Sequence, residues 1–167
     1  DALFIRETTN VNNHTFRIAK KAQSEGLVVI DDPVSIMRCT NKVYLNELMR
    51  NHGINTPKAA IISKENPMAA IEKIGFPFIL KEPDGAFSKG VKKVQNEEEF
   101  NELLKGFFKG SELLIAQEFM PTDFDWRVGI FNGEPLYVCK YFMARNHWQI
   151  IEWKKSGKAQ EGKAETY

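Results

Sequence analysis

The chain has 167 residues, of which 43% are hydrophobic, and its formal net charge is +1. This composition allows one sizeable core or two small lobes, and it excludes a chain that is disordered throughout. The nearly balanced charge disfavours a protein that binds nucleic acid by neutralising phosphates, and it favours a small polar ligand, while leaving a local basic patch open.

The sequence carries no signal for membrane insertion, secretion or a disulfide scaffold. No apolar run approaches the length of a membrane span, and the N-terminus lacks the basic-then-apolar order of a signal peptide. The cysteines Cys39 and Cys139 are too few for a disulfide framework or a metal cluster, so we expect both to be reduced. We therefore predict a cytoplasmic protein with no membrane partner.

The first part of the chain has the pattern of a parallel β-α-β unit. Ala2–Ile5 is apolar enough for a strand, and Asn12 or Asn13 can cap the helix that follows. Leu27–Ile30 predicts a second strand that is fully buried, and Val34–Cys39 predicts a short helix. Because the first strand begins almost at the first residue, we expect the chain to start inside a fold.

The next segment predicts two helices separated by a short strand. Thr40 is a suitable N-cap for a helix over residues 41–51, and Ala59–Ile62 predicts a strand. Asn66 and Pro67 then supply an N-cap and a first-turn proline for another helix.

A strand, a glycine-bracketed loop and a returning strand form the centre of the sequence. The apolar run Phe76–Leu80 predicts a buried strand that ends on Lys81. A loop bracketed by Gly85 and Gly90, called the clasp loop below, leads to a second strand that begins at Val91. The segment is therefore predicted to be a hairpin.

The clasp loop has the glycine spacing of a P-loop but lacks its other residues. Val91 and Lys92 stand where that motif needs Lys and then Ser or Thr, so the P-loop interpretation fails. The loop can still offer backbone N–H groups, around Ser88 for example, to an anion, while Lys81 and Lys89 supply positive charge. The alternative is an ordinary solvated hairpin.

A well-capped helix and another apolar strand follow. Asn96 precedes Glu97–Glu99, which predicts an N-cap, a capping-box glutamate and acidic charge at the positive end of the helix dipole. This explanation accounts for all three glutamates, so we prefer it to a metal cluster. Gly110 closes the helix, and Leu113–Phe119 predicts the next strand.

A second hairpin is predicted around Asn132-Gly133, the strongest short-range turn signal in the chain. A two-residue turn there pairs Asp125 with Lys140 and places Arg127 on the same face of the sheet. The alternative explanation is a surface ion pair of little energetic value. Beyond Trp153 the composition predicts a flexible tail, from about residue 154.

The order of these parts resembles a known family, the ATP-grasp carboxylate–amine ligases, and within it the glutathione-synthetase-like and RimK-like glutamate ligases. The resemblance covers roughly residues 41–142 and depends on the order and spacing of short segments. These segments are Thr40-Asn41-Lys42, Gly53-Ile54-Asn55-Thr56-Pro57, Ile74-Gly75-Phe76-Pro77 leading to Lys81, the clasp loop, Gln117-Glu118-Phe119-Met120, and Asp125-Trp126-Arg127 before Asn132-Gly133.

The resemblance implies an α/β (α+β) fold with two ATP-grasp lobes. Residues 1–39 would be the remnant of a preceding parallel β-α-β domain, and residues 40–112 an α+β lobe that carries the clasp hairpin. Residues 113–167 would begin the second lobe. On this interpretation the chain is a fragment, truncated at both ends.

The same resemblance implies a nucleotide site between the two lobes. Lys42 and Lys81 match lysines that contact the phosphates, and Gly85, Ser88 and Gly90 belong to the loop that closes over them. Glu118, Phe119 and Met120 match the segment whose backbone holds adenine. Asp125 matches the residue that contacts the ribose, and Arg127 would point toward the transferring phosphate or the acyl substrate, as the candidate catalytic residue.

The chemistry implied is transfer of the γ-phosphate of ATP to a carboxylate, followed by attack of an amine to form an amide or peptide bond. The expected cofactors are ATP and Mg²⁺, and the partners are a small-molecule or peptide carboxylate and an amino-acid amine. The chain departs from the family at its metal ligands, which lie on later strands. Neither Glu152 nor Glu161 has such a context, so no metal ligand is predicted here and turnover by this chain is not expected.

Two other functions stay open from the sequence. One is a non-catalytic nucleotide-binding or scaffold module that kept the clasp without the chemistry. The other is a nucleic-acid binder that uses Lys89, Lys92, Lys93 and the lysines of the tail. The oligomeric state, including a homo-oligomer, and the identities of the acid and the amine are likewise open.

Overall fold

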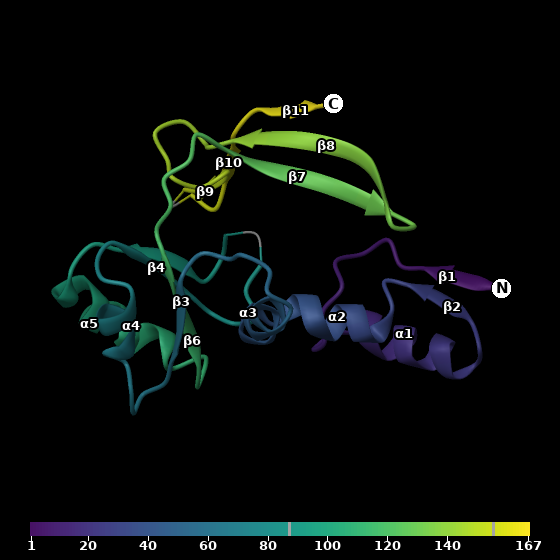
Figure 1. Ribbon diagram of the computed structural model, residues 1–167, viewed down its shortest axis with the longest axis horizontal. Helices are drawn as coiled ribbons and strands as arrows, with labels where there is room; N and C mark the ends of the chain where they lie inside the picture. Colours follow the sequence, from purple (N-terminus) through teal and green to yellow (C-terminus); the bar gives the residue numbers. More distant parts are fainter. Residues whose placement is uncertain (87, 155) are drawn as a thin grey trace. The chain divides into compact units, whose positions relative to one another are not determined.

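A computed structural model describes residues 1–86, 88–154 and 156–167. It divides the chain into two compact units (Figure 1). The first unit consists of Asp1–Gly85 and Gly90–Glu118, and the second of Ala86–Lys89 and Phe119–Tyr167. Helices and sheets are mixed along the chain, which confirms the predicted α/β fold class. Within the described ranges, no helix has both the length and the apolar character needed to cross a membrane.

The first unit opens with the predicted β-α-β unit. β1 (Ala2–Phe4) and β2 (Val28–Ile30) pair in parallel, and α1 (His14–Ser24) connects them. Asn13 caps α1 by accepting the Thr15 N–H at 2.9 Å. The expectation that β2 is fully buried was wrong. Val29 is 8% exposed, but its neighbours Val28 and Ile30 are 65% and 43% exposed, because α1 and α2 cover only one face of this two-stranded sheet.

Two helices follow in close succession. α2 (Pro33–Thr40) is capped by Asp32, and α3 (Lys42–Asn51) is capped by Asn41. The prediction that Thr40 caps α3 was therefore wrong by one residue. The Thr40 hydroxyl donates to the Ile36 carbonyl within α2, whereas the Asn41 side chain accepts the Tyr44 N–H at 3.0 Å. Both side chains could serve as caps, and only their backbone positions decide between them.

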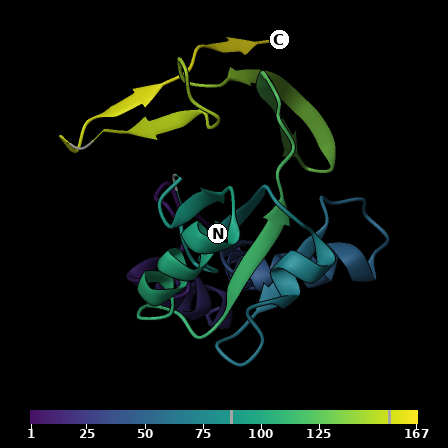
Figure 2. The same ribbon diagram turned by 90° about the vertical axis from the view of Figure 1, so that its left-hand side faces the viewer.

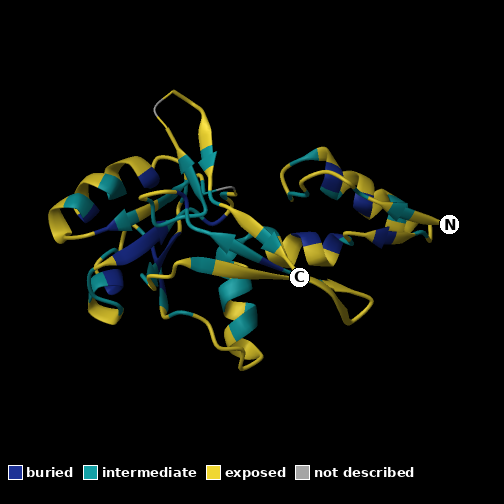
Figure 3. Cartoon of the chain, turned by 90° about the horizontal axis from the view of Figure 1, so that it is seen from above, coloured by how far each residue is buried: buried dark blue, intermediate teal, exposed yellow. Residues whose placement is uncertain are grey.

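A four-stranded antiparallel sheet forms the larger part of the first unit. Its order is β3-β6-β4-β5, made of β3 (Ala59–Ile62), β6 (Leu114–Glu118), β4 (Phe78–Lys81) and β5 (Val91–Val94). Alternate residues of the strands, such as Phe78 and Leu80, pack with α4 (Ala69–Lys73) and α5 (Glu97–Phe107) in one core. Figure 3 shows the dark blue of buried residues on this sheet and on the helices beside it.

The predicted N-cap is confirmed for α5 but not for α4. α5 begins as expected, because Asn96 accepts the Glu99 N–H at 2.9 Å, and the Glu99 carboxylate accepts the Gln95 N–H at 2.8 Å. α4 begins later than predicted, with Met68 at its N-cap and no side-chain cap. Asn66 lies in a turn instead, where its N–H donates to the Ser63 carbonyl.

The second unit is made of β-strands. β7 (Phe124–Phe131) and β8 (Glu134–Phe142) form the predicted hairpin, and β11 (Ala164–Thr166) adds to β8. β9 (Ile151–Trp153) pairs with β10 (Ala159–Glu161) in a separate short hairpin, drawn in yellow-green and yellow in Figure 2. The segment after Trp153, for which a flexible tail was predicted, contains the two strands β10 and β11.

The register of the long hairpin differs from the prediction by one residue. Phe131 pairs with Glu134 as expected, but a β-bulge between Gly129 and Ile130 shifts all earlier pairs. Leu136 is left without a partner, next to Pro135, which cannot donate a ladder hydrogen bond. Asp125 consequently lies opposite Tyr141, and the expected pair of Asp125 with Lys140 was wrong.

Candidate functional site

Lys81 lies on the face of the four-stranded sheet that turns away from α4 and α5. Because side chains alternate along a strand, Lys81 points to the opposite side from the core residue Leu80. Its ammonium group donates to Oε1 of Gln117, which stands on the neighbouring strand β6 and on the same face. A cation at a strand end beside an amide is an arrangement that can receive an anion. The sequence had given Gln117 no role, although a polar residue within the run Leu113–Phe119 was the signal.

A backbone hydrogen bond joins the two sides of the clasp loop. The Glu82 N–H donates to the Gly90 carbonyl at 2.9 Å. Gly90 has a φ of +64°, a backbone conformation that favours glycine, and a Cβ added there would also force the Glu82 carboxylate to move. Ser88 also has a positive φ, of 61°. The loop backbone is thus bent in the way that exposes N–H groups in anion-binding loops. Phe87 lies outside the described residues.

Lys42 and its neighbour Asn41 hold the segment that leads into the clasp loop. The Lys42 backbone N–H donates to the Pro83 carbonyl at 2.9 Å, and its ammonium group donates to the same carbonyl and to that of Gly85. The Asn41 side chain donates to Oδ1 of Asp84 at 2.9 Å. The start of α3 is therefore joined to three consecutive residues, 83–85, where the chain enters the clasp loop.

The partial burial of Lys42 changes its acidity. Desolvation lowers the pKa of the ammonium group below its ordinary value, and the negative charges of Asp84 and Glu82 oppose this effect in part. The sequence predicted a phosphate contact for Lys42. That contact stays a prediction, and what the structure shows is that Lys42 fixes the entry to the clasp loop through the carbonyls of Pro83 and Gly85.

The segment predicted to hold adenine lies at the end of β6. The Glu118 carboxylate accepts the Lys58 N–H at 2.8 Å, and the Glu118 N–H donates to the Lys58 carbonyl at 2.9 Å. The carboxylate is thus engaged with the backbone of the neighbouring segment. In the second unit, the Phe119 ring packs edge-on against Trp148, with 6.0 Å between ring centroids, and Met120 is 58% exposed.

Asp125 and Arg127 share one face of the β7–β8 hairpin, as predicted. Asp125 accepts a hydrogen bond from the Thr122 hydroxyl at 3.2 Å. A hydrogen bond with Tyr141 raises the pKa of Arg127, with a smaller contribution from Tyr137. The Tyr137 ring lies against Gly129, where an added Cβ would be 2.3 Å from its Cε1. Sequence reasoning missed both tyrosines, because the bulge decides which residues of β8 share this face.

Lys140 lies on the opposite face from the one predicted. It stands across from Trp126, and its Nζ is 3.9 Å from the ring centroid of Phe124 and 5.2 Å from that of Phe142. This is a cation–π arrangement on the aromatic face of the hairpin. The predicted grouping of Lys140 with Asp125 and Arg127 was wrong because the β-bulge shifts the pairing of β7 with β8 by one residue.

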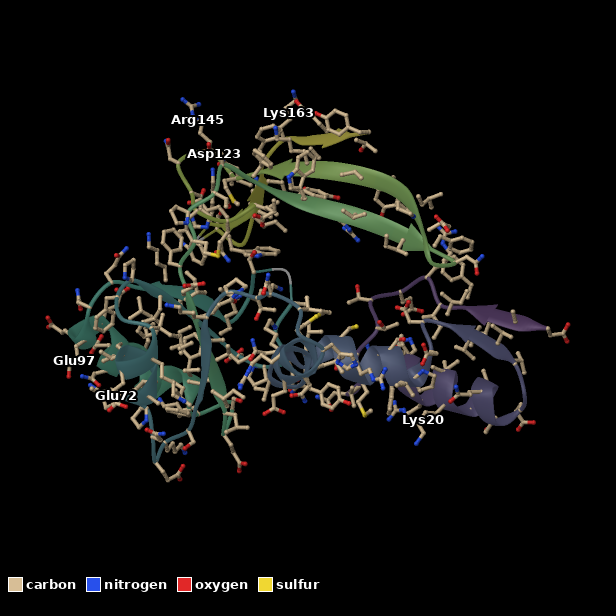
Figure 4. All side chains as sticks on the ribbon, viewed as in Figure 1. Lys20, Glu72, Glu97, Asp123, Arg145 and Lys163 are labelled. Carbon is tan, nitrogen blue, oxygen red and sulfur yellow. The ribbon has the colours of Figure 1, made fainter. Side chains whose placement is uncertain are left out.

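Other cations and acids of the second unit lie near the C-terminal strands. Lys163, labelled in Figure 4, donates to the Glu165 carboxylate at 2.6 Å. Lys89, from the tip of the clasp loop, has its Nζ 4.8 Å from the Trp153 ring centroid. Across residues 1–86, 88–154 and 156–167, no three His, Cys, Asp or Glu side chains gather in a way that could hold a metal ion.

Comparison with known proteins identifies the family. The chain matches the RimK-like ATP-grasp domain over residues 39–135, from the end of α2 into β8. It is 26% identical to the alpha-aminoadipate–LysW ligase LysX of Saccharolobus solfataricus, over 88% of this chain and 55% of that protein. It is 28% identical to the D-alanine–D-alanine ligase of Aquifex aeolicus, over 76% of this chain and 48% of that protein. The chain thus spans about half the length of these curated relatives.

Solved structures show the same fold. A D-alanine–D-alanine ligase from Bacillus anthracis has a TM-score of 0.68 at 20% identity, over 90% of this chain and 48% of that one. A RimK domain ATP-grasp protein from Sphaerobacter thermophilus has a TM-score of 0.67 at 14% identity, over 98% of this chain and 72% of that one. Since the family match includes more than half of the residues, the chain belongs to the RimK-like ATP-grasp family.

Proposed function

We propose that this chain is the ATP-binding part of an ATP-dependent carboxylate–amine ligase. The observation that carries the proposal is Lys81 at the end of β4, on the sheet face opposite α4 and α5 and separated by three residues from the clasp loop. A strand-end cation and a loop of bent backbone together suit the charge and the oxygen atoms of a triphosphate. Every residue predicted for the site lies within the matched range 39–135, and curated relatives are named as ligases.

Each predicted residue has a role in this proposal. Lys81 and Lys42 contact phosphate oxygens, and Gly85, Ser88 and Gly90 offer loop N–H groups. The backbone from Glu118 through Phe119 to Met120 holds the adenine ring, and Asp125 accepts hydrogen bonds from the ribose hydroxyls. Arg127, whose guanidinium is oriented by Tyr141, is the catalytic candidate that neutralises charge on the transferring phosphate.

The reaction joins an acid and an amine in two steps. A carboxylate oxygen attacks the γ-phosphorus of ATP, which releases ADP and forms an acylphosphate. The amine nitrogen then attacks the acyl carbon, phosphate leaves, and an amide bond remains. Relatives are named for ligating alpha-aminoadipate to LysW or for joining two D-alanines, which supports an amino acid or peptide on at least one side.

Mg²⁺ enters the proposal with the nucleotide, because a triphosphate needs its charge neutralised during transfer. The described residues include no acidic cluster that fits a metal ion, so we assign none of them as a ligand. The domain division also belongs to the proposal: a preceding α/β remnant over 1–39, the clasp lobe over 40–112, and the start of the second lobe over 113–167.

The test is calorimetric titration of Mg·ATP into this chain and, where a longer natural protein contains it, into that protein. Lys81→Ala is expected to weaken binding at least tenfold, because it removes the cation beside the phosphates. Lys92→Ala is the matched control, since Lys92 is exposed and points to the other face of the same sheet. Equal affinities for the two variants, or no binding by the longer protein, would overturn the nucleotide site.

A second measurement separates a ligase from a non-catalytic nucleotide-binding module. Phosphate release from ATP is followed in the longer protein with mixtures of amino acids as acids and amines. A ligase releases phosphate only when both an acid and an amine are present. Tight ATP binding without release under any mixture supports the module instead.

A further inference from the structure

A cavity whose lining does not include Lys81 lies within the first unit. Its volume is about 420 Å³, which falls within the range of small-molecule sites, about 300–1,000 Å³. It is formed by the loop before α1, by α2, by the N-cap and N-terminal half of α3, and by one residue just before the clasp loop. Its lining residues are Val11, Asn12, Met37, Asn41, Val43, Tyr44, Glu47 and Asp84.

The apolar part of the lining remains open to solvent. Val11, Met37 and Tyr44 are 37%, 42% and 40% exposed. Apolar side chains that gather around a hollow and stay exposed are a feature of ligand sites. An occupant with an apolar body would cover them.

The charged part of the lining is entirely acidic. Glu47 and Asp84 contribute carboxylates, and the lining includes no Lys, Arg or His. Among the described residues, neither carboxylate forms an ion pair, since the three ion pairs of the structure join other residues. Lys42 interacts electrostatically with Asp84, but its ammonium group donates to the carbonyls of Pro83 and Gly85. The cavity therefore favours a cation.

One wall of the cavity is fixed by hydrogen bonds. Asn41 accepts the Tyr44 N–H at 3.0 Å and donates to Oδ1 of Asp84 at 2.9 Å. These bonds hold the Asp84 carboxylate beside α3 before any ligand arrives. A preformed acceptor of this kind costs less ordering on binding.

We propose that this cavity binds an organic ammonium ion with an apolar body, with its charge between Glu47 and Asp84. The aromatic ring of Tyr44 would add a cation–π contact. Because Asp84 belongs to the segment that Asn41 and Lys42 hold, the occupant would also restrain residues 83–85. The site is independent of the proposed nucleotide chemistry and can be tested without ATP.

The experiment is a nuclear magnetic resonance titration of this chain, with labelled Val and Met methyl groups, by phenethylammonium chloride. Saturable shifts are expected at Val11, Met37 and Val43, and slower exchange of the Lys42 N–H. Phenylpropionate, which has the same ring and a negative charge, is expected to give no saturable shift. Higher salt should weaken the binding of the ammonium ion.

Two variants locate the charge that matters. Glu47→Gln is expected to weaken phenethylammonium binding about tenfold. Glu72→Gln removes the same charge from the exposed surface of α4, outside the cavity, and is expected to leave the affinity unchanged. The absence of saturable shifts, equal binding of phenylpropionate, or equal losses in both variants would overturn the site. None of these outcomes bears on ATP binding, which is measured separately.

Discussion

The two larger sheets of the molecule bury their apolar side chains to very different extents. In the four-stranded sheet of the first unit, Phe78, Leu80 and Leu114 are 0% exposed. In the three-stranded sheet of the second unit, Trp126 and Leu136 are 58% and 67% exposed. The first sheet has α4 and α5 packed on one face, whereas the described residues of the second unit include no helix. Alternating apolar residues along a strand do not form a core by themselves; a second layer of helices or strands must pack on that face of the sheet.

The largest test of this comparison replaces one leucine in each sheet. Leu80→Ala is expected to lower the free energy of unfolding by about 2–5 kcal/mol, because it leaves a cavity in a closed core. Leu136→Ala is expected to change it by less than about 0.5 kcal/mol, since that side chain is already in solvent. Urea denaturation measures both values. Similar losses from the two variants would contradict the difference in burial.

The second test asks how tightly the hairpin itself is packed. Gly129→Ala would push a methyl group into the Tyr137 ring, and we expect a loss of about 1–3 kcal/mol. Gly106→Ala in α5 meets nothing within 4 Å and should stabilise the first unit, by up to about 0.5–1 kcal/mol. Thermal unfolding followed by circular dichroism reports both signs. A neutral Gly129→Ala would show that the ring does not lie on this glycine.

The third test weakens the helix that covers the first sheet. Asn96→Ala removes the side chain that accepts the Glu99 N–H, which should cost about 1 kcal/mol. Asn101→Ala, on the exposed surface of the same helix, is the control and should cost nothing. Hydrogen exchange of the α5 amides is the measurement. Equal acceleration in both variants would show that the cap adds no stability of its own.

The smallest expected effect is a pH dependence confined to the second sheet. Hydrogen bonds from Lys163 and then Tyr167 lower the pKa of Glu165 below its ordinary value of 4.5. The carboxylate form is favoured in the folded chain, so its support of β11 is complete above pH 4.5 and is lost as the pH falls through the lowered pKa.

Nuclear magnetic resonance titration of the Tyr167 N–H, which donates to the Val138 carbonyl, follows this change. A midpoint below 4.5 is expected, together with constant signals from Phe78 and Leu80 in β4, which contains no carboxylate, over the same range. Glu165→Gln should remove the transition at β11. A midpoint at or above 4.5 would contradict the hydrogen bonds.

Local signals in the sequence predicted most elements of the fold. Asn96 was expected as a cap, and so was either Asn12 or Asn13; Asn96 and Asn13 act as caps, because a cap is decided within one turn of a helix. The prediction that Thr40 caps α3 was wrong because Thr40 and Asn41 are adjacent polar residues that can both act as an N-cap. The position at which α2 ends determines which of them is used. The prediction that β2 is fully buried was wrong because burial depends on the elements that cover a strand, and the sequence of the strand does not specify them.

The sequence predicted which residues belong to the candidate site, but not which residues they contact. Lys81 was expected at a strand end, yet its partner Gln117 stands on a strand 36 positions later, so only the sheet order brings them together. The carbonyl partners of Lys42 and the tyrosines beside Arg127 were missed for similar reasons. Contacts across elements depend on register, and register depends on details such as the bulge.

The bulge at Leu136 has a consequence for how this hairpin is aligned with those of other proteins. Because one unpaired residue separates Pro135 from Tyr137, a regular hairpin can be superposed only if a single-residue gap is opened there. Without that gap, every position from 137 to 142 is assigned to the wrong side of the sheet. A role transferred from a homologue would then fall on Lys140 or Phe142 in place of Tyr141, the residue that stands beside Arg127.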